Sequence, residues 1–369
     1  MKVLLTATVQ SHICQFHKPL VEVLHKHGCE VHVAAKNNLA EKNGLALDFV
    51  EKVYNVPFAR SPKSPDNLKA YRKLKKIIEK EQYDVIHCNT PMGGIVTRLA
   101  ARKSRKHGTK VYYTAHGFHF YKGAPLTNWL LYYPVEKYCS RLCDMIITIN
   151  EEDYQRAKGF HAKRTEKIPG VGVNLDCFAP NNDVRKQWRE KLELSPNDTL
   201  LLTVGELTPR KNQHVMIKAV KLLQNSNVKL FVCGCGKLEL QLKNTVKMLE
   251  LEEQVKLLGY RKDIPQLCCA ADAFVFTSIQ EGLPRALLEA MADGKAIVCS
   301  NIRGNVDLVK DGKGGLVVRN DAESVAAALK ELIENQRLRE EMGAYNMKAA
   351  EMFKEENSLK KVCMLLQDL

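Results

Sequence analysis

The chain has 369 residues, a formal net charge of +14 at pH 7 and a hydrophobic fraction of 45%. This length predicts about two domains and a chain that can bury a substantial core. No run of 18 apolar residues occurs, and the N-terminus lacks the longer apolar segment and cleavage site of a signal peptide. We therefore expect neither a transmembrane helix nor an export signal.

The twelve cysteines show no pattern of a zinc site. Cys88 and Cys233 lie in strand-like runs, where a thiol behaves as a small apolar residue. Cys139-x3-Cys143 and Cys233-Gly-Cys235 lack partner His or Cys pairs at zinc spacing. We expect reduced thiols, a cytoplasmic protein and no bound metal.

The first half of the chain alternates strand and helix patterns. Apolar runs predict strands at residues 3–7, 30–35, 83–88, 110–115 and 145–149. Apolar positions at helical spacing predict helices at 15–27, 65–80, 93–106 and 127–141. This is the βαβ rhythm of a doubly wound parallel sheet in an α/β protein.

A second series of the same kind begins near Thr199. Its predicted strands are 200–204, 228–233, 255–257, 273–276 and 296–299. Its predicted helices are 213–223, 238–249 and 284–292, followed by a helical end at 322–335, 336–350 and 356–367. The segment 168–178, with one proline and two glycines, is predicted to connect the series. The expected domains are therefore 1–172 and 173–369.

Nearly all of the excess positive charge lies in the first half. Residues 1–172 hold 28 Lys and Arg against 15 Asp and Glu, which leaves the remainder close to neutral. Two basic clusters recur at helical spacing beside apolar positions: Lys69, Arg72, Lys73, Lys75, Lys76 and Lys80, then Arg98, Arg102, Lys103, Arg105 and Lys106. Each is read either as the solvated face of a helix or as a surface for anionic lipids, worth on the order of 1 kcal/mol per basic residue. No recognised nucleic-acid motif accompanies the charge.

The aromatic segment 121–133 also has two readings. Most such stripes are explained by packing into a hydrophobic core. The alternative is an interfacial patch with Trp129 and the following tyrosine pair at the level of lipid headgroups.

The most informative segment runs from Glu281 to Glu289. It follows an apolar strand and contains Pro284, which is suited to open a helix. Glu281 then sits at the mouth of the helix and Glu289 a little over two turns inside it. A helix mouth favours a phosphate, so two carboxylates beside it suit a nucleotide sugar. The alternative is one carboxylate in a loop and another on a solvated helix face.

This segment resembles the Glu-x7-Glu signature of the retaining glycosyltransferases of family 4. The resemblance implies a GT-B fold, with two Rossmann-like doubly wound parallel-sheet domains facing across a cleft. It implies that Glu281 contacts the donor sugar as a catalytic residue and that Glu289 binds the ribose. Gly205, Glu206, Gly282, Leu283 and Pro284 are assigned to the donor pocket. His116, Arg210 and Lys211 are expected to join Glu281 as catalytic residues.

The loop that starts at Gly205 carries Arg210 and Lys211, which can place two cations on a diphosphate. Ordinary surface charge is the alternative reading. In family 4 a Gly-Arg pair is followed by a Lys, and Lys211 matches that residue. Glu206 stands where the family usually has Arg, so Arg210 is expected to supply the missing charge. The resemblance further implies two contacts to the nucleotide base, from Tyr260 and Arg261.

In the first half, His116 follows a predicted strand and precedes a glycine. Without the resemblance, a structural histidine would be the default reading. The family has a His at this strand end, which implies that His116 contacts a sugar hydroxyl or phosphate of the donor. On the acceptor side we expect Ser11, His12, Asn89 and His119.

The sequence at residues 115–121 and 204–208 resembles that of the bacterial branch of the family that builds capsular and exopolysaccharide repeat units. This implies a nucleotide-sugar donor, UDP-linked, and a polyprenyl-diphosphate-linked saccharide acceptor. It also implies a peripheral position at the inner face of the cell membrane. The N-terminal domain would bind the acceptor and the C-terminal domain the nucleotide sugar, with the last helix (about 356–367) returning to the N-terminal domain.

No Asp-x-Asp motif occurs, so protein cations rather than a metal are expected to offset the charge of the leaving diphosphate. We expect no cofactor. The sequence also allows two other functions. One is a GT-B nucleotide-sugar 2-epimerase, and the other is a non-enzymatic basic protein that binds membranes or nucleic acid.

Overall fold

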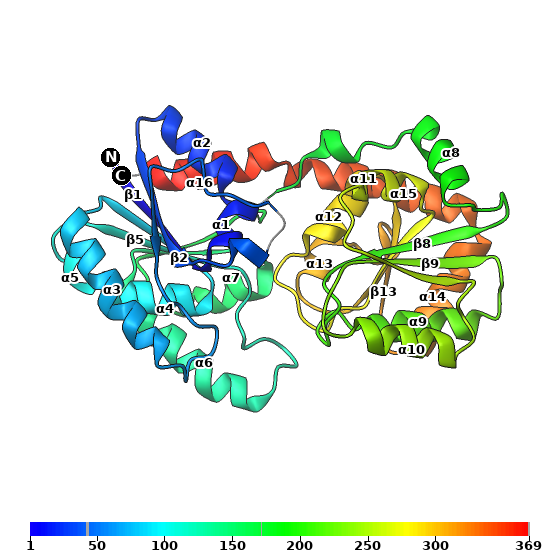
Figure 1. Ribbon diagram of the computed structural model, residues 1–369, viewed down its shortest axis with the longest axis horizontal. Helices are drawn as coiled ribbons and strands as arrows, with labels where there is room; N and C mark the ends of the chain where they lie inside the picture. Colours follow the sequence, from blue (N-terminus) through cyan, green and yellow to red (C-terminus); the bar gives the residue numbers. More distant parts are fainter. Residues whose placement is uncertain (42–43, 171, 368–369) are drawn as a thin grey trace. The chain divides into compact units, whose positions relative to one another are not determined.

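The computed structural model describes residues 1–41, 44–170 and 172–367 (Figure 1). Residue 171, which belongs to the predicted connector, lies outside this range. Strands and helices alternate along almost the whole chain. Within the described residues, no helix is both long enough and apolar enough to cross a lipid bilayer.

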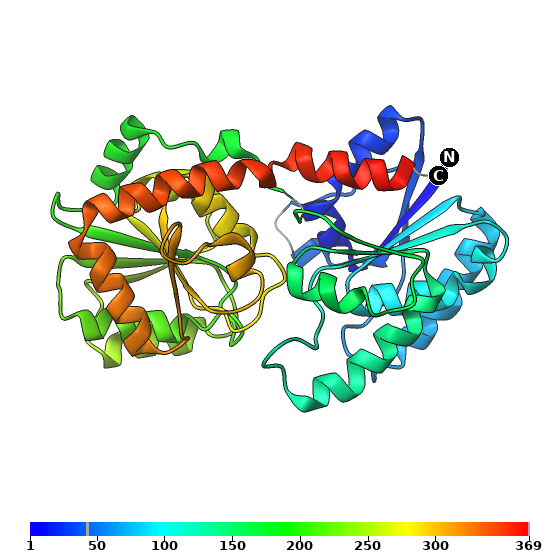
Figure 2. The same cartoon turned by 180° about the vertical axis from the view of Figure 1, so that it is seen from behind.

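The chain divides into two compact units. Unit 1 comprises Met1–Val171 together with Glu356–Leu369, and unit 2 comprises Gly172–Glu355. Unit 1 is therefore discontinuous in sequence, because its last segment follows the whole of unit 2. Figure 2 shows this final helix, in red, lying along unit 1.

Unit 1 is built on a parallel sheet with the strand order β3-β2-β1-β4-β5-β6-β7. Its strands are β1 (Lys2–Val9), β2 (Glu30–Lys36), β3 (Lys52–Asn55), β4 (Val85–Asn89), β5 (Lys110–Ala115), β6 (Met145–Thr148) and β7 (Arg164–Lys167). The chain runs outward from β1 to β3 and then returns to pair β4 with the other side of β1. The connections diverge between β1 and β4, and in sheets of this kind ligands bind outside the carboxyl ends of the strands at such a point.

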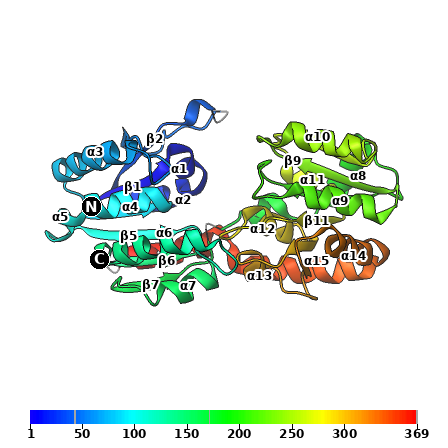
Figure 3. The same cartoon turned by 90° about the horizontal axis from the view of Figure 1, so that it is seen from below.

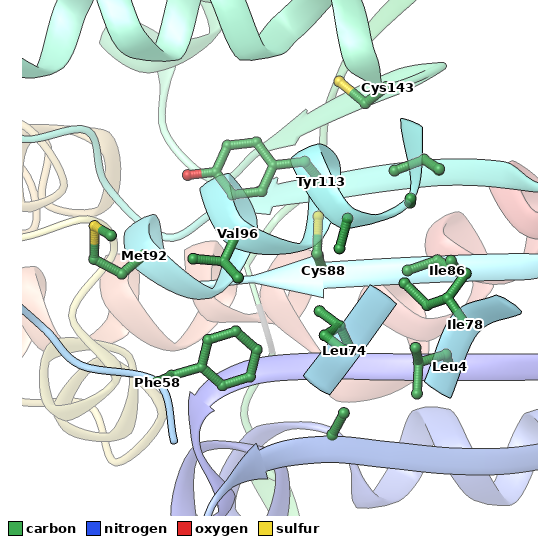
Figure 4. Packing of buried hydrophobic residues seen from close by; sticks show 14 of the residues in the cluster. Leu4, Phe58, Leu74, Ile78, Ile86, Cys88, Met92, Val96, Tyr113 and Cys143 are labelled. Carbon is green, nitrogen blue, oxygen red and sulfur yellow. The ribbon is translucent and has the colours of Figure 1, made fainter. Parts of the chain in front are cut away.

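Helices cover both faces of this sheet. They are α1 (Gln10–Phe16), α2 (Lys18–Lys26), α3 (Asp66–Glu81), α4 (Pro91–Ala100), α5 (Arg102–Arg105), α6 (Leu126–Cys139), α7 (Glu151–Ala157) and α16 (Glu355–Gln367), with short 3-10 turns η1 (Leu39–Glu41) and η2 (Ser140–Leu142). On one face, Leu74 and Ile78 of α3 and Val96 of α4 pack against Leu4 and Ile86 of the strands (Figure 4). This core holds β1 and β4 rigidly, and with them the loops that follow.

Unit 2 repeats the arrangement with the strand order β10-β9-β8-β11-β12-β13, again with all pairs parallel. Its strands are β8 (Thr199–Val204), β9 (Val228–Cys233), β10 (Val255–Gly259), β11 (Ala273–Phe276), β12 (Ala296–Ser300) and β13 (Gly315–Val318). The connections diverge between β8 and β11. The position at which such sheets bind ligands therefore lies, in unit 2, outside the carboxyl ends of these two strands.

The helices of unit 2 form two layers. They are α8 (Asn182–Lys191), α9 (Gln213–Leu223), α10 (Glu239–Met248), α11 (Ile264–Ala270), α12 (Arg285–Ala292), α13 (Asn305–Leu308), α14 (Ala322–Glu334) and α15 (Gln336–Ala350), with 3-10 turns η3 (Leu175–Phe178) and η4 (Glu351–Phe353). Figure 1 shows α9, α10 and α14 on one side of the sheet, and α11 and α12 on the other. Side chains alternate between the two cores, as the period of two in a strand requires: Leu200 and Leu202 face one core and Leu201 the other.

Three strands are missing from the sequence-based prediction, and all three are edge strands. They are β3, β7 and β13, and Figure 3 shows β7 at the border of the unit 1 sheet with α7 beside it. β3 reads Lys-Val-Tyr-Asn and β7 reads Arg-Thr-Glu-Lys. An edge strand has one neighbour only and tolerates polar side chains, so in β3 and β7 the apolar run that reveals a buried strand is absent. β13 reads Gly-Leu-Val-Val, and its apolar run is only three residues long. Elsewhere the agreement is closer, and α9 begins and ends at the predicted residues.

The prediction that Arg98 belongs to a solvated helix face is wrong. Its side chain is fully buried, and the guanidinium donates a hydrogen bond of 2.6 Å to Glu136 Oε2. The same guanidinium lies 4.0 Å from the centroid of the Tyr113 ring, whose hydroxyl donates to Glu136 at 3.2 Å. A buried cation is tolerated only when it is paired, and this partner lies 38 positions away in sequence. The lysines of α3, by contrast, are exposed or half-buried.

The two ends of unit 2 lie side by side. The N–H of Val173 donates to the carbonyl of Phe353 at 2.9 Å, and the N–H of Glu355 donates back to the carbonyl of Val173 at 3.2 Å. Gly172 has a φ of +79°, and a Cβ there would come within 2.4 Å of Glu355 Cα. Only glycine therefore fits where the two segments meet.

Candidate active site

In unit 2 the predicted site residues gather at the edge formed by the carboxyl ends of the parallel strands. Arg210 and Lys211 lie in the loop after β8, and Glu281 lies in the loop after β11. These two strands are neighbours in the sheet, and the connections diverge between them. Doubly wound sheets bind ligands at such a switch point.

Glu281 is held between two cations. Its Oε1 lies 2.7 Å from the Arg210 guanidinium and 2.8 Å from Lys211 Nζ, and the residue is only 8% exposed. Arg210 also donates to the backbone carbonyl of Gln280 at 2.9 Å. The structure thus brings together three of the four residues predicted as catalytic. Arg210 and Glu281, which contact each other, lie 71 positions apart in sequence.

The two loops that carry these charges are fastened to each other. Thr277 Oγ1 donates to the carbonyl of Asn212 at 2.9 Å, and the N–H of Ile279 donates to the carbonyl of Arg210 at 2.8 Å. Asn320 Nδ2 adds a hydrogen bond of 2.8 Å to the carbonyl of Thr277. Because each of these bonds ends on a backbone carbonyl of one of the two loops, they hold the loop backbones, and with them the charged residues, close together.

The side chain of Lys211 packs against Phe276 and Gly205. Its ammonium lies 4.5 Å from the centroid of the Phe276 ring, and a Cβ added at Gly205 would come within 3.3 Å of its Cε. Gly234, after β9, has a φ of +143°, and a Cβ there would come within 2.0 Å of the Gly205 carbonyl oxygen. The glycines after β8 and β9 therefore let two loops approach closely beneath the lysine.

The electrostatics of this cluster keep Glu281 charged. Burial alone would raise the pKa of the Glu281 carboxyl, but the charges of Lys211 and Arg210 more than offset burial and hold this pKa below its ordinary value. Burial lowers the pKa of the Lys211 ammonium, and Glu281 offsets this only in part. The cluster is thus a preformed set of charges with a net positive balance.

Glu289 lies inside α12, whose N-cap is Pro284. Its Oε1 accepts a hydrogen bond of 2.9 Å from Arg285, one turn earlier, and its side chain is 15% exposed. Burial raises the pKa of Glu289, and Arg285 offsets this only in part. The helix begins at Arg285, one residue later than predicted. The carboxylate of Glu289 is largely covered by protein, so the reading as a carboxylate on a solvated helix face is wrong.

The other residues predicted for the donor lie on the same edge of unit 2. Tyr260, after β10, is 62% exposed, and Arg261 is paired with Asp263 through a hydrogen bond of 2.8 Å. Glu206 is exposed, and its backbone carbonyl accepts a hydrogen bond of 3.1 Å from Gln213. Gly282 and Leu283, which link Glu281 to α12, are half-buried.

Arg303 is a component of this site that sequence reasoning did not single out. It is 6% exposed and its Nε donates to the backbone carbonyl of Glu281 at 3.2 Å. The next residue, Gly304, has a φ of +79° and lies so close to the Gly282 carbonyl that a Cβ would approach it within 2.6 Å. An arginine in a loop carries no sequence signal of burial, so the sequence alone does not reveal the contact of Arg303 with Glu281.

In unit 1 a second group of predicted residues meets at the corresponding edge. Asn89, which ends β4, and His116, which follows β5, are joined by a hydrogen bond of 3.1 Å between Asn89 Oδ1 and His116 Nε2. The ring of His12, in α1, stands nearly perpendicular to that of His116 at a centroid distance of 4.7 Å. Ser11 Oγ accepts a hydrogen bond of 2.8 Å from Asn38.

Two further histidines belong to this group and are missing from the prediction. His17 is 5% exposed, with its ring centroid 5.3 Å from that of His12, and His87 is 2% exposed, with its centroid 6.0 Å from that of His17. The predicted helix 15–27 is wrong at this point, since His17 separates α1 from α2 with a φ of −122°. In a continuous helix the rings of His12 and His17 would point in different directions, so the helix pattern does not predict that they lie close together.

His119 takes a different environment. Its ring packs against that of Tyr132 in α6 at 4.8 Å, and its backbone carbonyl accepts a hydrogen bond of 3.0 Å from Asn128. The neighbouring Trp129 and Tyr133 pack against the core of unit 1. The aromatic segment is therefore largely explained by core packing, which was the first of its two readings.

Two family models together match most of the chain. The model described as Glycosyltransferase Family 4 matches residues 19–176, and the model described as Glycosyl transferases group 1 matches residues 184–349. The first falls almost wholly in unit 1 and the second in unit 2.

Several relatives align over most of their length. EpsD of Bacillus subtilis, described provisionally as a glycosyltransferase, is 40% identical over 98% of this chain and 95% of its own. The UDP-Gal:alpha-D-GlcNAc-diphosphoundecaprenol alpha-1,3-galactosyltransferase of Escherichia coli is 31% identical over 79% of this chain and 78% of its own. The capsular polysaccharide biosynthesis glycosyltransferase CapM of Staphylococcus aureus is 24% identical over 90% and 87%.

Solved structures show the same fold. The structure of Anabaena HepE in complex with UDP has a TM-score of 0.80 at 22% identity and covers all of both chains. WaaG, a glycosyltransferase involved in lipopolysaccharide biosynthesis, has a TM-score of 0.77 at 18% identity and covers 98% of both. The predicted GT-B fold, with two Rossmann-like parallel sheets, is confirmed.

Proposed function

Because this chain belongs to glycosyltransferase family 4, we propose that it transfers a sugar from a UDP-linked donor to a lipid-linked saccharide, with retention at the anomeric carbon. Its relatives include glycosyltransferases named for capsular polysaccharide biosynthesis and for lipopolysaccharide core biosynthesis. The single observation that carries the proposal is Glu281, buried between Arg210 and Lys211 at the switch point of unit 2.

The donor occupies the edge of unit 2 in this proposal. Glu289 binds the ribose hydroxyls, and Tyr260 with Arg261 lies against the base. The choice of UDP draws on the relative of Escherichia coli, whose name specifies UDP-galactose, and on the UDP complex of HepE. Arg210 and Lys211 bind the diphosphate, since one offers a planar fork and the other a compact charge.

Arrival of the diphosphate redistributes the ion pairs of the free protein. Both cations contact the same oxygen of Glu281, so a bound diphosphate competes with that carboxylate for them. Glu281 is then released to accept hydrogen bonds from the hydroxyls of the donor sugar. The cations are already in place where charge develops on the leaving group, which is the arrangement that lowers a transition-state barrier.

Retention follows, in this proposal, from attack by the acceptor hydroxyl on the face from which the diphosphate leaves. The two cations of unit 2 offset the leaving charge, so the transfer itself is proposed to need no metal ion. His116 contacts a hydroxyl or phosphate of the donor, and Ser11, His12, Asn89 and His119 lie on the acceptor side. The polyprenyl diphosphate of the acceptor draws on the diphosphoundecaprenol named for the relative of Escherichia coli.

We also propose that unit 1 lies on the anionic inner surface of the cell membrane. Helix α6 exposes Leu126, Leu130 and Leu131, which are 73%, 68% and 58% accessible, while Trp129, Tyr132 and Tyr133 pack inward. Exposed apolar side chains beside lysine-rich helices are typical of proteins that bind the headgroup region. The patch is thus made of leucines rather than of Trp129 and the tyrosines.

The donor class can be tested by thermal unfolding with UDP, GDP and ADP. A ligand that binds only the folded protein stabilises it by about 2.7 kcal/mol at a hundredfold excess over its dissociation constant. We expect UDP to raise the melting temperature of the wild type and of Glu239→Ala, whose carboxylate forms a surface pair with Lys243. The shift should be lost in Glu289→Ala. No shift with any nucleotide at millimolar concentration, or an undiminished shift in Glu289→Ala, would overturn the donor site.

A further inference from the structure

Three histidines of unit 1 present their ring nitrogens to one another. His12 comes from α1, His17 from the junction of α1 and α2, and His116 from the end of β5. One ring nitrogen from each lies within 4.8 Å of those of the other two. Segments more than 100 positions apart in sequence thus converge on a single point.

The polar atoms at this point lack partners. The Nε2 atoms of His12 and His17 are buried and make no hydrogen bond. The Nε2 of His116 is bonded to Asn89 Oδ1 at 3.1 Å, which leaves its Nδ1 as the available nitrogen. Buried polar atoms nearly always have a hydrogen-bond partner. The two unpartnered ring nitrogens of His12 and His17 therefore indicate a site for a ligand.

The backbone at His17 is what makes the convergence possible. In a continuous helix, residues five positions apart point about 140° away from each other around the axis. The break between α1 and α2 at His17 turns its ring back toward His12, to a centroid distance of 5.3 Å. The ring of His17 is also 6.2 Å from that of His116.

We propose that His12, His17 and His116 bind one divalent transition-metal ion, Zn²⁺ being the best match. Neutral imidazole is the commonest ligand of zinc, and three protein nitrogens with one open position form a known type of zinc site. Ligand nitrogens of a tetrahedral zinc lie about 3.4 Å apart, so the rings need to move by roughly 1 Å to close on the ion. His12 and His116 are partly exposed, which leaves a path for the ion and for a fourth ligand.

The surroundings match those of bound metal sites. A ligating histidine is usually oriented by a hydrogen bond from its other ring nitrogen, and Asn89 provides this for His116. Beneath the three rings lies His87, whose Nε2 is bonded to Thr114 Oγ1 at 2.7 Å. The floor of the site is therefore fixed by β4 and β5. The open position would take an oxygen ligand, either water or a phosphate oxygen.

This inference goes beyond the proposed transfer and does not depend on it. In the transfer, the leaving diphosphate is neutralised by cations of unit 2, whereas the metal would sit on unit 1. A metal at this point would occupy the Nδ1 of His116, and because Asn89 holds its Nε2, the ion would replace the direct contact of His116 with the donor while the contacts of Glu281 stay unchanged. Binding can be measured without donor, acceptor or turnover, so failure of one proposal leaves the other standing.

The test is a titration of the full chain, purified without a histidine tag, with Zn²⁺ alone and with Co²⁺ alone. We expect one ion per chain, and visible absorption of Co²⁺ at the intensity of a four- or five-coordinate site rather than of the hydrated ion. In His12→Ala the affinity should fall by more than about 100-fold, since loss of even an outer partner costs about 10–100-fold. The matched control is His214→Ala, which removes a partly exposed histidine from a helix of unit 2.

Circular dichroism of each variant establishes that it is folded, and His12→Ala is preferred to His17→Ala because His12 is the less buried of the two. A second variant, Asn89→Ala, keeps all three ligands and should weaken binding by about 10-fold or more. The proposal is overturned if the folded wild type binds neither metal at about 100-fold molar excess. It is also overturned if His12→Ala binds as tightly as His214→Ala.

Discussion

The two units share one topology and place different chemistry at the same position of it. In each, the strand order diverges on either side of the first strand, and polar residues gather outside the carboxyl ends of the central pair. Unit 2 fills that position with formal charges, since Arg210 and Lys211 enclose Glu281. Unit 1 fills it with imidazoles, and burial lowers the pKa of His87 and of His116 to about 4, so these rings are neutral near pH 7.

The difference shows how the fold and the loops divide the work. The sheet determines where polar groups meet, because parallel strands end at one edge. The loops decide whether the residues at this edge are charged or neutral. A charged cluster suits a diphosphate, whereas neutral imidazoles suit an uncharged group or a metal ion. Four variants can break or sharpen this contrast.

The largest effect should come from the buried ion pair of Arg98 and Glu136 in unit 1. In Glu136→Ala the buried Arg98 loses its partner and keeps its charge, and we expect the free energy of unfolding to fall by about 3–5 kcal/mol. Chemical denaturation measures this. Glu79→Ala, which breaks an exposed pair with Lys103, should change it by less than about 1 kcal/mol. Equal effects would show that burial of Arg98 carries no cost.

Next in size is the loss of a cation from the edge of unit 2. Lys211→Ala removes a charge aimed at the leaving diphosphate, and we expect kcat to fall by about 10²–10³-fold while the fold is preserved. Sugar transfer to a lipid-linked acceptor, monitored by mass, measures this. Lys243→Ala, in a surface pair with Glu239, serves as the control and should leave kcat unchanged. An active Lys211→Ala enzyme would remove the basis for metal-free transfer.

A smaller effect should come from the packing of the unit 2 loops. Gly234→Ala places a Cβ within 2.0 Å of the Gly205 carbonyl oxygen, and we expect a loss of about 1–3 kcal/mol in unfolding free energy. Gly259→Ala is matched to it, because Gly259 also has a positive φ but has open space around its Cα. If both variants lose the same stability, backbone strain rather than crowding limits this position.

The smallest effect should appear on the surface of unit 1. Leu130→Ser removes a leucine that is 68% exposed on α6, and we expect binding to vesicles with anionic lipids to weaken by about 10-fold. Leu240→Ser alters a leucine that is 72% exposed on α10 of unit 2 and should bind as the wild type does. Sedimentation with vesicles measures both. Equal loss in the two variants would contradict a membrane surface confined to unit 1.

The sequence was sufficient for the central strands and for the grouping around Glu281, because apolar runs mark buried strands and residues that follow neighbouring strands must meet. It was insufficient where partners lie far apart in the chain. The sequence around Arg98 does not indicate that Glu136 is its partner. The turn at His17 interrupts a pattern of apolar residues that otherwise predicts one helix. The roles given to Glu281, Lys211 and the other site residues stay predictions.

The discontinuity of unit 1 has a consequence for the order of synthesis. A ribosome completes residues 1–170 early, but α16, whose Ser358 and Val362 are buried, emerges last. During translation the earlier domain therefore stays incomplete while the later one can already fold. A stop codon before Glu355 would leave unit 2 nearly whole and withhold from unit 1 a helix of its own, so premature termination damages the part of the protein that was made first.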